Sequence, residues 1–505
     1  MQSDKDNIMQ SEKDNLNKEK DNLNNDKDNI MQSETDNLNK DNIMQSETDN
    51  LNNEKDNIMQ SETEKNISSS KFKLICCEDI NNDSNNDSTN DSTNDSNYIT
   101  ETKFNINFNE SDIQEKPKIE YGYNQLLNDY RNKIDKIDND IWKKIRWYIN
   151  EYDFIVKYPI INRAFYKYWE MINEFDIFSN YNINNDIILH CAEAPGGFIQ
   201  GTNIYLQIEK FHNSINKESS KIKIEIDDDG FTKYINKKKL SKKHHYNIYT
   251  ISLNKDLPKY KMFNLPSYNK LVLNKHVYTL YGKDSTGDIN NLENIDYIEQ
   301  ITLNSHFYLI TGDGGFDEGC DFNNKEQLHY QLITNEIYAA IKLQKKDGHF
   351  ILKMFDIFTD TSIHLLYLLS ICYKSVHIYK PVTSRPTNSE KYIICKGFKI
   401  NDNIKAILLD KLKNISKTFI SKQNNTKKYY SFTLFNEIPA QFIENIKNIN
   451  IELLKKQCIF LQKAINFCND NEFLQKYNIE YTKSSEYRKK TFKKWVDYYN
   501  LNAYI

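Results

Sequence analysis

Apolar positions along the chain follow two periods, and together these periods predict the order of elements. From residue 119 onward, apolar residues recur at helical spacing, which predicts helices over 119–145 and 162–175. Beyond them, short β-branched or aromatic runs alternate with helical stretches at 327–343 and 362–373. Six such runs are expected to be strands, at 187–191, 247–253, 307–311, 349–355, 375–379 and 391–395. This alternation predicts an α/β fold, a mostly parallel sheet with helices on both faces.

Over the first 110 residues we identify neither a helical nor a strand pattern. The unit I-M-Q-S-E recurs at residues 8, 30, 43 and 58 at irregular intervals, with no repeating apolar face, and residues 81–97 mix Asn, Asp, Ser and Thr. We expect a disordered acidic tail, with a short helical or interaction role for the repeat left open. The expected domains are the tail at 1–110, a helical lead-in at 111–160, the α/β domain at 161–400 and a helical extension at 401–505, clearest over 438–467.

Charge is divided unevenly along the chain. The 67 basic and 71 acidic residues give a net charge of −4, but residues 1–100 hold 10 basic and 23 acidic residues, which leaves +9 for the rest. A basic body favours a polyanionic partner over a metabolite, although ordinary surface charge is the open alternative. We expect neither a membrane span nor a metal site, because the longest apolar run is short and the eight cysteines lack C-x-x-C or zinc-finger spacing. These features favour an intracellular protein.

A glycine-containing loop follows the first strand of the predicted domain. The strand Ile187–Cys191 runs into the segment Ala192, Glu193, Ala194, Pro195, Gly196, Gly197 and Phe198. Paired glycines at this point let a ligand approach the backbone at the carboxyl end of the strand, although a purely structural turn is the alternative. The chain has neither G-x-G-x-x-G nor G-x-x-x-x-G-K-[ST] here, which disfavours a dinucleotide or nucleoside triphosphate enzyme.

Two lysines and two acids lie where a parallel sheet would gather them. Lys167 is on the helix before the first strand, Asp313 follows the strand 307–311, and Glu390 precedes the last strand. Lys353 interrupts the apolar strand 349–355, where a lysine is costly unless it is paired or functional. The other three have ordinary alternatives as solvated or turn-forming residues. Because carboxyl ends of neighbouring parallel strands converge, all four side chains are able to meet.

These motifs together resemble the FtsJ-like 2′-O-methyltransferases, and in particular the eukaryotic and viral cap-specific mRNA 2′-O-methyltransferases that make the cap-1 structure. The resemblance covers roughly residues 120–400. It is carried by N-R-A-x-x-K at 162–167, A-P-G-G-F at 194–198, Y-G and T-G-D-I at 281–289, D-G-G-F at 313–316, G-H-F-I-L-K-M-F-D-I-F-T at 348–359 and K-P-V-T-S-R-P-T-N-S-E-K-Y at 380–392.

The resemblance implies a Rossmann-like domain that uses S-adenosylmethionine (SAM). The implied cofactor-binding residues are Cys191, Ala192, Glu193, Ala194, Pro195, Gly196, Gly197, Phe198, Asp288, Ile289 and Asp313. Asp288 would accept a hydrogen bond from the adenine amino group. The strand 247–253 ends without the family's usual acidic residue for the ribose.

The resemblance also implies a catalytic tetrad of Lys167, Asp313, Lys353 and Glu390, with Lys353 nearest the reacting 2′-hydroxyl. A lysine takes a proton at neutral pH only if its pKa is lowered, and we expect burial and the second ammonium to lower it. No metal is needed in this mechanism.

The implied substrate is capped mRNA, with Asn162 and the loop after Asp313 facing the RNA. Arg146 is expected to meet the cap or its phosphates. The aromatic residues considered for stacking, with core packing as the alternative, are Trp142, Trp147, Trp169 and Tyr281. The basic run 237–245 would either hold RNA or form a solvated loop.

The expected function is therefore methylation of the ribose 2′-oxygen of a cap-proximal nucleotide. Two alternatives are the same reaction on ribosomal or transfer RNA, and a catalytically inactive RNA-binding subunit of a capping complex. The tail is a candidate contact for capping or transcription machinery. The expected compartment is the nucleus if the protein is cellular, and the host cytoplasm or virion if it is viral.

Overall fold

The protein is described here by a computed structural model that covers residues 70–75, 104–119, 121–152, 160–215, 223–226, 232–235, 246–261, 263, 265–315, 322–422 and 429–503. The repeat units, the polar tract 81–97, the basic run 237–245 and the segment 316–321 after the D-G-G sequence lie outside these residues.

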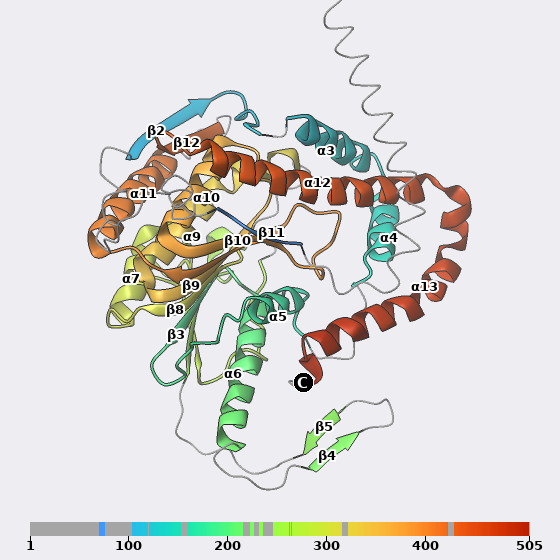
Figure 1. Ribbon diagram of the computed structural model, residues 1–505, viewed down its shortest axis with the longest axis horizontal. Helices are drawn as coiled ribbons and strands as arrows, with labels where there is room; N and C mark the ends of the chain where they lie inside the picture. The colour runs from blue at the N-terminus through green and yellow to red at the C-terminus, as the bar shows by residue number, and fades with distance from the viewer. Residues whose placement is uncertain are drawn as a thin grey trace, which may run out of the picture. The chain divides into compact units, whose positions relative to one another are not determined.

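A twisted eight-stranded sheet forms the centre of the described chain (Figure 1). Its strand order is β1 (Ser70–Lys73), β10 (Tyr373–Lys380), β11 (Lys391–Phe398), β9 (Gln344–Met354), β8 (Phe307–Gly312), β3 (Ile187–Cys191), β6 (Asn247–Ile251) and β7 (Val277–Leu280). The strands from β9 to β7 pair in parallel, whereas β11 is antiparallel to both β9 and β10. The expected mostly parallel sheet is confirmed.

Helices cover both faces of this sheet. The chain forms α3 (Tyr121–Ile134), α4 (Asn139–Ile149), α5 (Ala164–Glu174), α6 (Gly197–Ile215), α7 (Leu292–Ile301), α8 (Lys325–Leu328), α9 (Tyr330–Leu343), α10 (Asp360–Cys372), α11 (Asp402–Lys422), α12 (Ala440–Asn469) and α13 (Asn471–Tyr498). On β3, Leu189 joins the apolar core with α7 and α9, while the next residue, His190, bonds to Thr202 of α6. Successive residues of one strand thus face α7 and α9 on one side and α6 on the other, as expected for a strand covered on both faces.

Two strands lie within the segment expected to be disordered, so that expectation was wrong at both places. β1 pairs antiparallel with β10, where it covers the edge of the sheet, and Leu74 directly after it is fully buried in the main core. β2 (Phe104–Ser111) pairs with β12 (Tyr429–Phe435), and its Phe108 stacks on Phe432. The alternation of apolar residues with Asn over 104–108 was the signal in the sequence.

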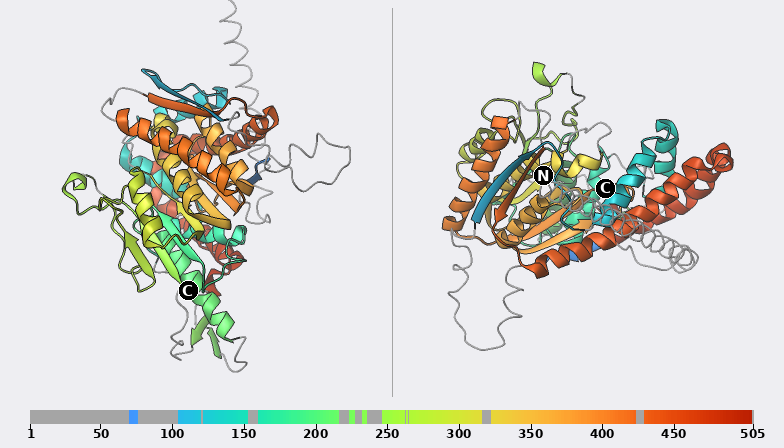
Figure 2. Two further views of the ribbon diagram at one scale, coloured as in Figure 1. Left: turned by 90° about the vertical axis from the view of Figure 1, so that its left-hand side faces the viewer. Right: turned by 90° about the horizontal axis from the view of Figure 1, so that it is seen from above.

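The carboxyl-terminal extension is helical apart from β12, which the sequence analysis did not predict. Its helix α12 packs on the lead-in helices α3 and α4, as Figure 2 shows from above. Leu127 of α3, for example, belongs to one buried cluster with Leu454 and Leu461 of α12. Within the described ranges no helix combines the length and the apolar character needed to cross a bilayer. A separate hairpin pairs β4 (Lys223–Ile226) with β5 (Thr232–Ile235).

The core position of Leu74 generates a stability prediction. Leu74→Ala is expected to lower the free energy of unfolding by about 2–5 kcal/mol, because it leaves a cavity in the main core. The volume-conserving control Leu74→Met should cost less than about 1.5 kcal/mol. Urea unfolding of both variants measures the difference, and equal stabilities of Leu74→Ala and wild type would place this segment outside the core.

Candidate active site

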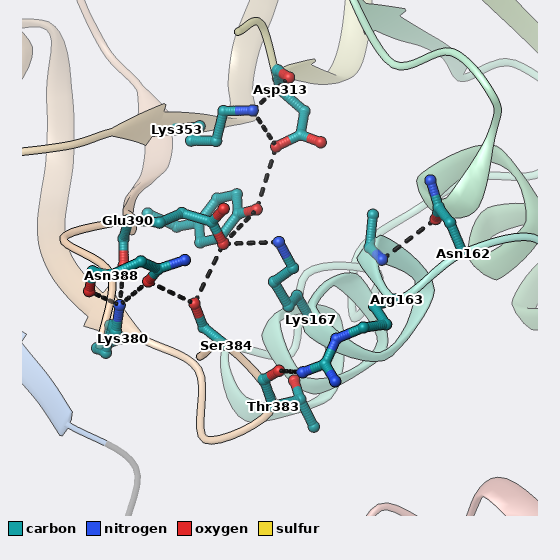
Figure 3. Close-up of polar contacts among 12 residues, drawn as sticks. Asn162, Arg163, Lys167, Asp313, Lys353, Lys380, Thr383, Ser384, Asn388 and Glu390 are labelled. Atoms are coloured by element: carbon teal, nitrogen blue, oxygen red, sulfur yellow. Dashed lines mark hydrogen bonds and ion pairs between the residues drawn. The ribbon is translucent and has the colours of Figure 1, made fainter. Parts of the chain in front are cut away.

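The four charged residues singled out in the sequence come from four different elements and converge (Figure 3). Lys167 lies on α5, and Asp313 follows β8 directly. Lys353 lies near the end of β9, and Glu390 immediately precedes β11. Because β8, β9 and β11 are neighbours in the sheet, their ends bring these side chains together.

The four side chains form two ion pairs. Lys167 Nζ lies 2.6 Å from Glu390 Oε1, and Lys353 Nζ lies 3.3 Å from Asp313 Oδ1. Lys353 also donates to the backbone carbonyl of Asp313 at 2.7 Å. All four side chains are only 12–15% exposed, so the attraction within each pair is weakly screened by water.

Tyr392 connects the two pairs. Its hydroxyl lies 3.1 Å from Asp313 Oδ1 and 3.4 Å from Glu390 Oε1, and Lys167 Nζ lies 5.9 Å from the centre of its ring. Tyr392 stands directly opposite Lys353 across β9 and β11. The sequence analysis quoted Tyr392 as the end of a motif and gave it no role, although this cross-strand register would have placed it beside Lys353.

The loop from β10 to β11 holds Glu390 in place. Lys380 donates at 2.6 Å to three oxygens of this loop, the carbonyls of Asn388 and Glu390 and the side-chain Oδ1 of Asn388. Ser384 donates to Glu390 Oε1 at 3.2 Å. Glu390 is therefore fixed at both its backbone and its carboxylate.

Burial and neighbouring charges act in opposite directions on the pKa values of the site. Burial alone would raise the pKa of Glu390, but Lys167, Lys353 and Lys380 together lower it far below its ordinary value. Burial alone would lower the pKa of Lys353, but Asp313, Glu390 and Glu336 more than offset this and raise it. The expected lowering of the lysine pKa is therefore not found for Lys353, because the three acids outweigh its burial.

Glu336 is a further acid of the site that the sequence analysis missed. It lies on α9, is 1% exposed, and its Oε1 accepts a hydrogen bond from the backbone N–H of Gly314 at 3.0 Å. Burial raises its pKa to about 8. A Cβ on Gly314 would lie 2.6 Å from Glu336 Oε1, and a Cβ on Gly315 would lie 3.2 Å from Lys353 Nζ. The two glycines of the D-G-G sequence therefore leave room for Glu336 and Lys353 beside Asp313. An acid inside the apolar helix 327–343 was the available signal.

The glycine loop is built around the buried Glu193. Its carboxylate accepts hydrogen bonds from the backbone N–H groups of Phe198 at 2.8 Å and Ile199 at 3.4 Å, which caps the start of α6. Gly196 has φ +114°, and a Cβ there would lie 2.8 Å from Val272. The N–H of Asp313 donates to the carbonyl of Cys191 at 3.2 Å. This contact joins the glycine loop directly to the two ion pairs.

The loop with Asp288 lies against the same end of the sheet. Gly287 has φ +68°, and a Cβ on it would lie 1.8 Å from the carbonyl oxygen of Ser252, just after β6. Ser252 in turn accepts a hydrogen bond from the N–H of Ala194 in the glycine loop at 3.3 Å. Asp288 is partly exposed, and its Oδ1 accepts from the N–H of Asn290. Through Ser252, the loop that carries Asp288 therefore lies next to the glycine loop.

Some of the expected cofactor contacts are core residues. Phe198 is fully buried and stacks on Tyr168 with ring centroids 4.7 Å apart, and its N–H is already bonded to Glu193. Cys191 and Ile289 are 1% and 5% exposed. The side chain of Phe198 is thus part of the packing that supports the loop.

The acidic side chains around the glycine loop and the ion pairs indicate the kind of ligand that fits here. Burial raises the pKa of Glu336 to about 8 and that of Glu193 well above its ordinary value, so both carboxyl groups are largely neutral at neutral pH, whereas Asp313 is paired with Lys353. A cationic ligand such as a sulfonium or ammonium would favour ionisation of these carboxyl groups and would be bound more tightly for that reason, whereas a pyrophosphate would oppose it. Within the described residues, no group of three or more His, Cys, Asp or Glu side chains is arranged to hold a metal ion.

Three arginines lie near one another, and two of them, Arg163 and Arg385, also lie near Glu390. Arg163 donates to the carbonyl of Thr383 at 2.7 Å, and burial together with Arg385 lowers its pKa to about 10. Burial and Arg385 likewise lower the pKa of Arg146. The Nε atoms of Arg146 and Arg385 are buried, and within the described chain neither has a hydrogen-bond partner. Guanidinium groups that repel one another at short range form a site for an anion.

The remaining expected substrate contacts divide by exposure. Asn162 accepts a hydrogen bond from the N–H of Ala164 at 3.1 Å and packs against Gly197, so it supports the glycine loop at the start of α5. Of the stacking candidates, Trp169 is fully buried and Trp142 packs against α12. Trp147 and Tyr281 are 51% and 36% exposed and are the accessible rings among these four candidates.

Comparison with known proteins gives a family for the central domain. Residues 160–398 match the family model described as FtsJ-like methyltransferase. The chain is 33% identical over 204 residues to cap-specific mRNA (nucleoside-2′-O-)-methyltransferase 1A of Caenorhabditis briggsae, which covers 39% of this chain and 23% of that protein. It is 31% identical over 204 residues to a protein of the same organism named inactive cap-specific mRNA (nucleoside-2′-O-)-methyltransferase 1B, covering 39% of this chain and 24% of that protein.

The chain thus spans less than a quarter of the length of these two relatives. A solved structure described as a ribosomal RNA methyltransferase from Plasmodium falciparum superposes on 47% of this chain and 97% of its own, with a TM-score of 0.30 and 20% identity, and supports no conclusion. The family match and the relatives agree on one point: residues 160–398 form an FtsJ-like methyltransferase domain, related in sequence to the cap-specific mRNA (nucleoside-2′-O-)-methyltransferases.

Proposed function

We propose that the domain transfers the methyl group of SAM to the ribose 2′-oxygen of a cap-proximal nucleotide of mRNA. The observation that carries this proposal is the convergence of two lysine–acid pairs, joined by Tyr392, at the end of the sheet that also holds the glycine loop. The name of the relative in Caenorhabditis briggsae, a cap-specific mRNA (nucleoside-2′-O-)-methyltransferase, supports the same reaction and substrate.

SAM would lie along the glycine loop, with Asp288 accepting from the adenine amino group. When bound, SAM supplies an electrophilic methyl group and one positive charge. The carboxyl groups of Glu193 and Glu336, whose pKa values are raised by burial, and the carboxylate of Asp313 support binding of that charge, because a nearby cation favours their ionised forms.

Lys353, in its neutral form, would take the proton of the 2′-hydroxyl as this oxygen forms a bond to the methyl carbon and the bond from that carbon to sulfur breaks. In the free protein Lys353 is held in its charged form by Asp313, Glu390 and Glu336. A cationic ligand and the loss of water on RNA binding both disfavour this charged form, so Lys353 should release its proton more readily in the complex. Lys167 would orient Glu390, and the two acids would then stabilise the ammonium of Lys353 after the transfer.

The arginines Arg146, Arg163 and Arg385 would bind phosphates of the RNA next to this centre. The buried Nε atoms of Arg146 and Arg385, which have no hydrogen-bond partner among the residues that the structure describes, support an anionic ligand at this place. Trp147 and Tyr281 are the candidates for stacking a base or the cap. The attacked 2′-hydroxyl itself excludes DNA as the substrate.

Contact of the amino-terminal tail with capping or transcription machinery stays a prediction, and so does the compartment of the protein. The rival functions, methylation of another RNA and inactivity, are separated by the experiments below. A relative named inactive, at 31% identity, shows that sequence similarity at this level does not decide between activity and inactivity.

The first prediction concerns Lys353. Lys353→Ala is expected to lower kcat by about 10²–10⁴-fold, the range typical for loss of a general base, while the SAM dissociation constant stays within about threefold. Lys346→Ala, an exposed lysine of the same strand, is the matched control and should retain wild-type turnover. Asp288→Ala should instead weaken SAM binding first. Turnover of Lys353→Ala equal to wild type would remove Lys353 from the mechanism.

The second prediction concerns pH. Because the pKa of Lys353 is raised in the free protein, its neutral form increases only as the pH approaches and passes the ordinary lysine value of about 10.4. The value of kcat/KM should therefore still rise at about pH 9.5. Glu390→Gln removes one acid that raises this pKa, so its smaller activity should rise at lower pH than that of wild type. Glu293→Gln, an exposed acid on α7, should not move the curve. A wild-type plateau already at neutral pH would contradict the assignment.

The third prediction concerns the substrate. Short RNAs with and without a cap, incubated with labelled SAM, should show a clear preference for the capped RNA, and nuclease mapping should place the label on a cap-proximal ribose. Equal methylation of both RNAs would favour ribosomal or transfer RNA as the substrate. Binding of RNA and SAM without any transfer would identify an inactive subunit.

A further inference from the structure

The helix α13 lies outside the matched domain, yet it contacts both helices that carry basic residues of the proposed RNA site. Arg146 lies on α4, whereas Arg163 and Lys167 lie at or within the start of α5. The first half of α13 packs along α4, and its second half packs along α5. In Figure 1, α13 runs from the end of α12 past α4 toward α5.

Arg488 makes the central contact between α13 and α4. It is 3% exposed, and its Nη1 donates to the carbonyls of Trp147 and Tyr148 at 3.2 and 3.3 Å. Its Nη2 donates within α13 to the carbonyl of Tyr481 and to Ser484 Oγ. The two carbonyls on α4 belong to its last turn, where carbonyls lack partners in the helix and a cation is favourable.

The position of Arg146 is tied to this anchor through the backbone of α4. Arg146 lies in the same last turn of α4 as Trp147 and Tyr148. Its Nε is buried and has no hydrogen-bond partner in the described chain, and the nearby Arg385 repels it. Its position toward the proposed phosphate site is therefore set by the backbone of α4, which Arg488 holds from the other side.

The contacts of α13 with α5 complete the same arrangement. Trp495 donates from Nε1 to Glu170 Oε2 at 3.2 Å, one turn along α5 from Lys167. Trp169 donates from Nε1 to the carbonyl of Tyr499 at 3.1 Å. One helix thus fixes α4 and α5 with respect to each other, and with them the arginines on these two helices.

We propose that α13 is a positioning element of the RNA site and that Arg488 is the residue through which it places Arg146. This inference rests on the proposed function, because it assigns Arg146 to RNA phosphates. Arg488 contacts neither the glycine loop nor the two ion pairs of the site. Replacing Arg488 should therefore weaken RNA binding and leave SAM binding unchanged.

The test is a double-mutant cycle on the full chain with Arg146→Ala, Arg488→Ala and the combined variant. Each single variant should raise KM for capped RNA about tenfold or more, the effect of losing one charge-assisted contact, with the SAM dissociation constant within about twofold of wild type. Each should also reduce the salt dependence of RNA binding by roughly one phosphate contact. The combined variant should be no worse than either single variant, because both remove the same contact.

Two further variants separate a positioning role from a general loss of stability or charge. Lys490→Ala removes an exposed positive charge from α13 and should leave KM near the wild-type value. Tyr477→Phe removes a second, milder anchor, the hydrogen bond from the Tyr477 hydroxyl to the carbonyl of Lys144 at 2.9 Å. It should raise KM in the same direction by less, about two- to fivefold, and it keeps the test decisive if Arg488→Ala does not fold.

The outcomes distinguish this inference from the proposed function. Multiplicative losses in the combined variant, or a wild-type KM for Arg488→Ala and Tyr477→Phe, would overturn the positioning role while Arg146→Ala still weakens RNA binding. If Arg146→Ala leaves RNA binding unchanged, the phosphate site itself is wrong. Hydrogen exchange of the amides at 145–150 tests the anchor without any activity: faster exchange in Arg488→Ala is expected, and unchanged exchange would contradict it.

Discussion

Two buried ammonium groups and two buried carboxylates have to balance one another, and this balance constrains the rest of the site. Lys167 and Lys353 are each about as buried as their acidic partners, and removing one partner of such a pair would leave a charge stranded at low dielectric. The surrounding contacts serve this balance. Tyr392 spans the two acids, and Lys380 fixes the loop that carries Glu390.

The same balance decides the resting state of the proposed base. Three acids raise the pKa of Lys353, so the free protein holds this lysine charged. Lys353 then becomes a base only when the positive charge of SAM and the exclusion of water by the bound RNA together lower its pKa. The acids that keep Lys353 charged, and so oppose catalysis in the free protein, also hold its side chain in position until both ligands are bound.

The sequence was sufficient for the parts of the site that consist of a charged residue in an apolar pattern or of a long motif. Lys353 stands out inside its strand, and the glycine loop follows a strand that the structure reproduces residue for residue. The role of Tyr392 could not be read from composition, because it depends on the register between β9 and β11. The raised pKa of Lys353 was missed because its sign depends on how many acids approach, and Glu336 was not counted. The edge strands β1 and β7 were missed because four-residue strands give little periodicity.

The domain that matches the family is not structurally self-contained. Its helix α5 is held by the carboxyl-terminal α13, and its edge strand β10 is covered by β1. The most direct test of the central claim is a crystal structure of the protein with capped RNA and an unreactive SAM analogue. The account predicts a cap-proximal 2′-oxygen within hydrogen-bond distance of Lys353 Nζ, about 2.6–3.2 Å, and facing the sulfur of the analogue. A 2′-oxygen out of reach of Lys353, with another side chain beside it, would contradict the account.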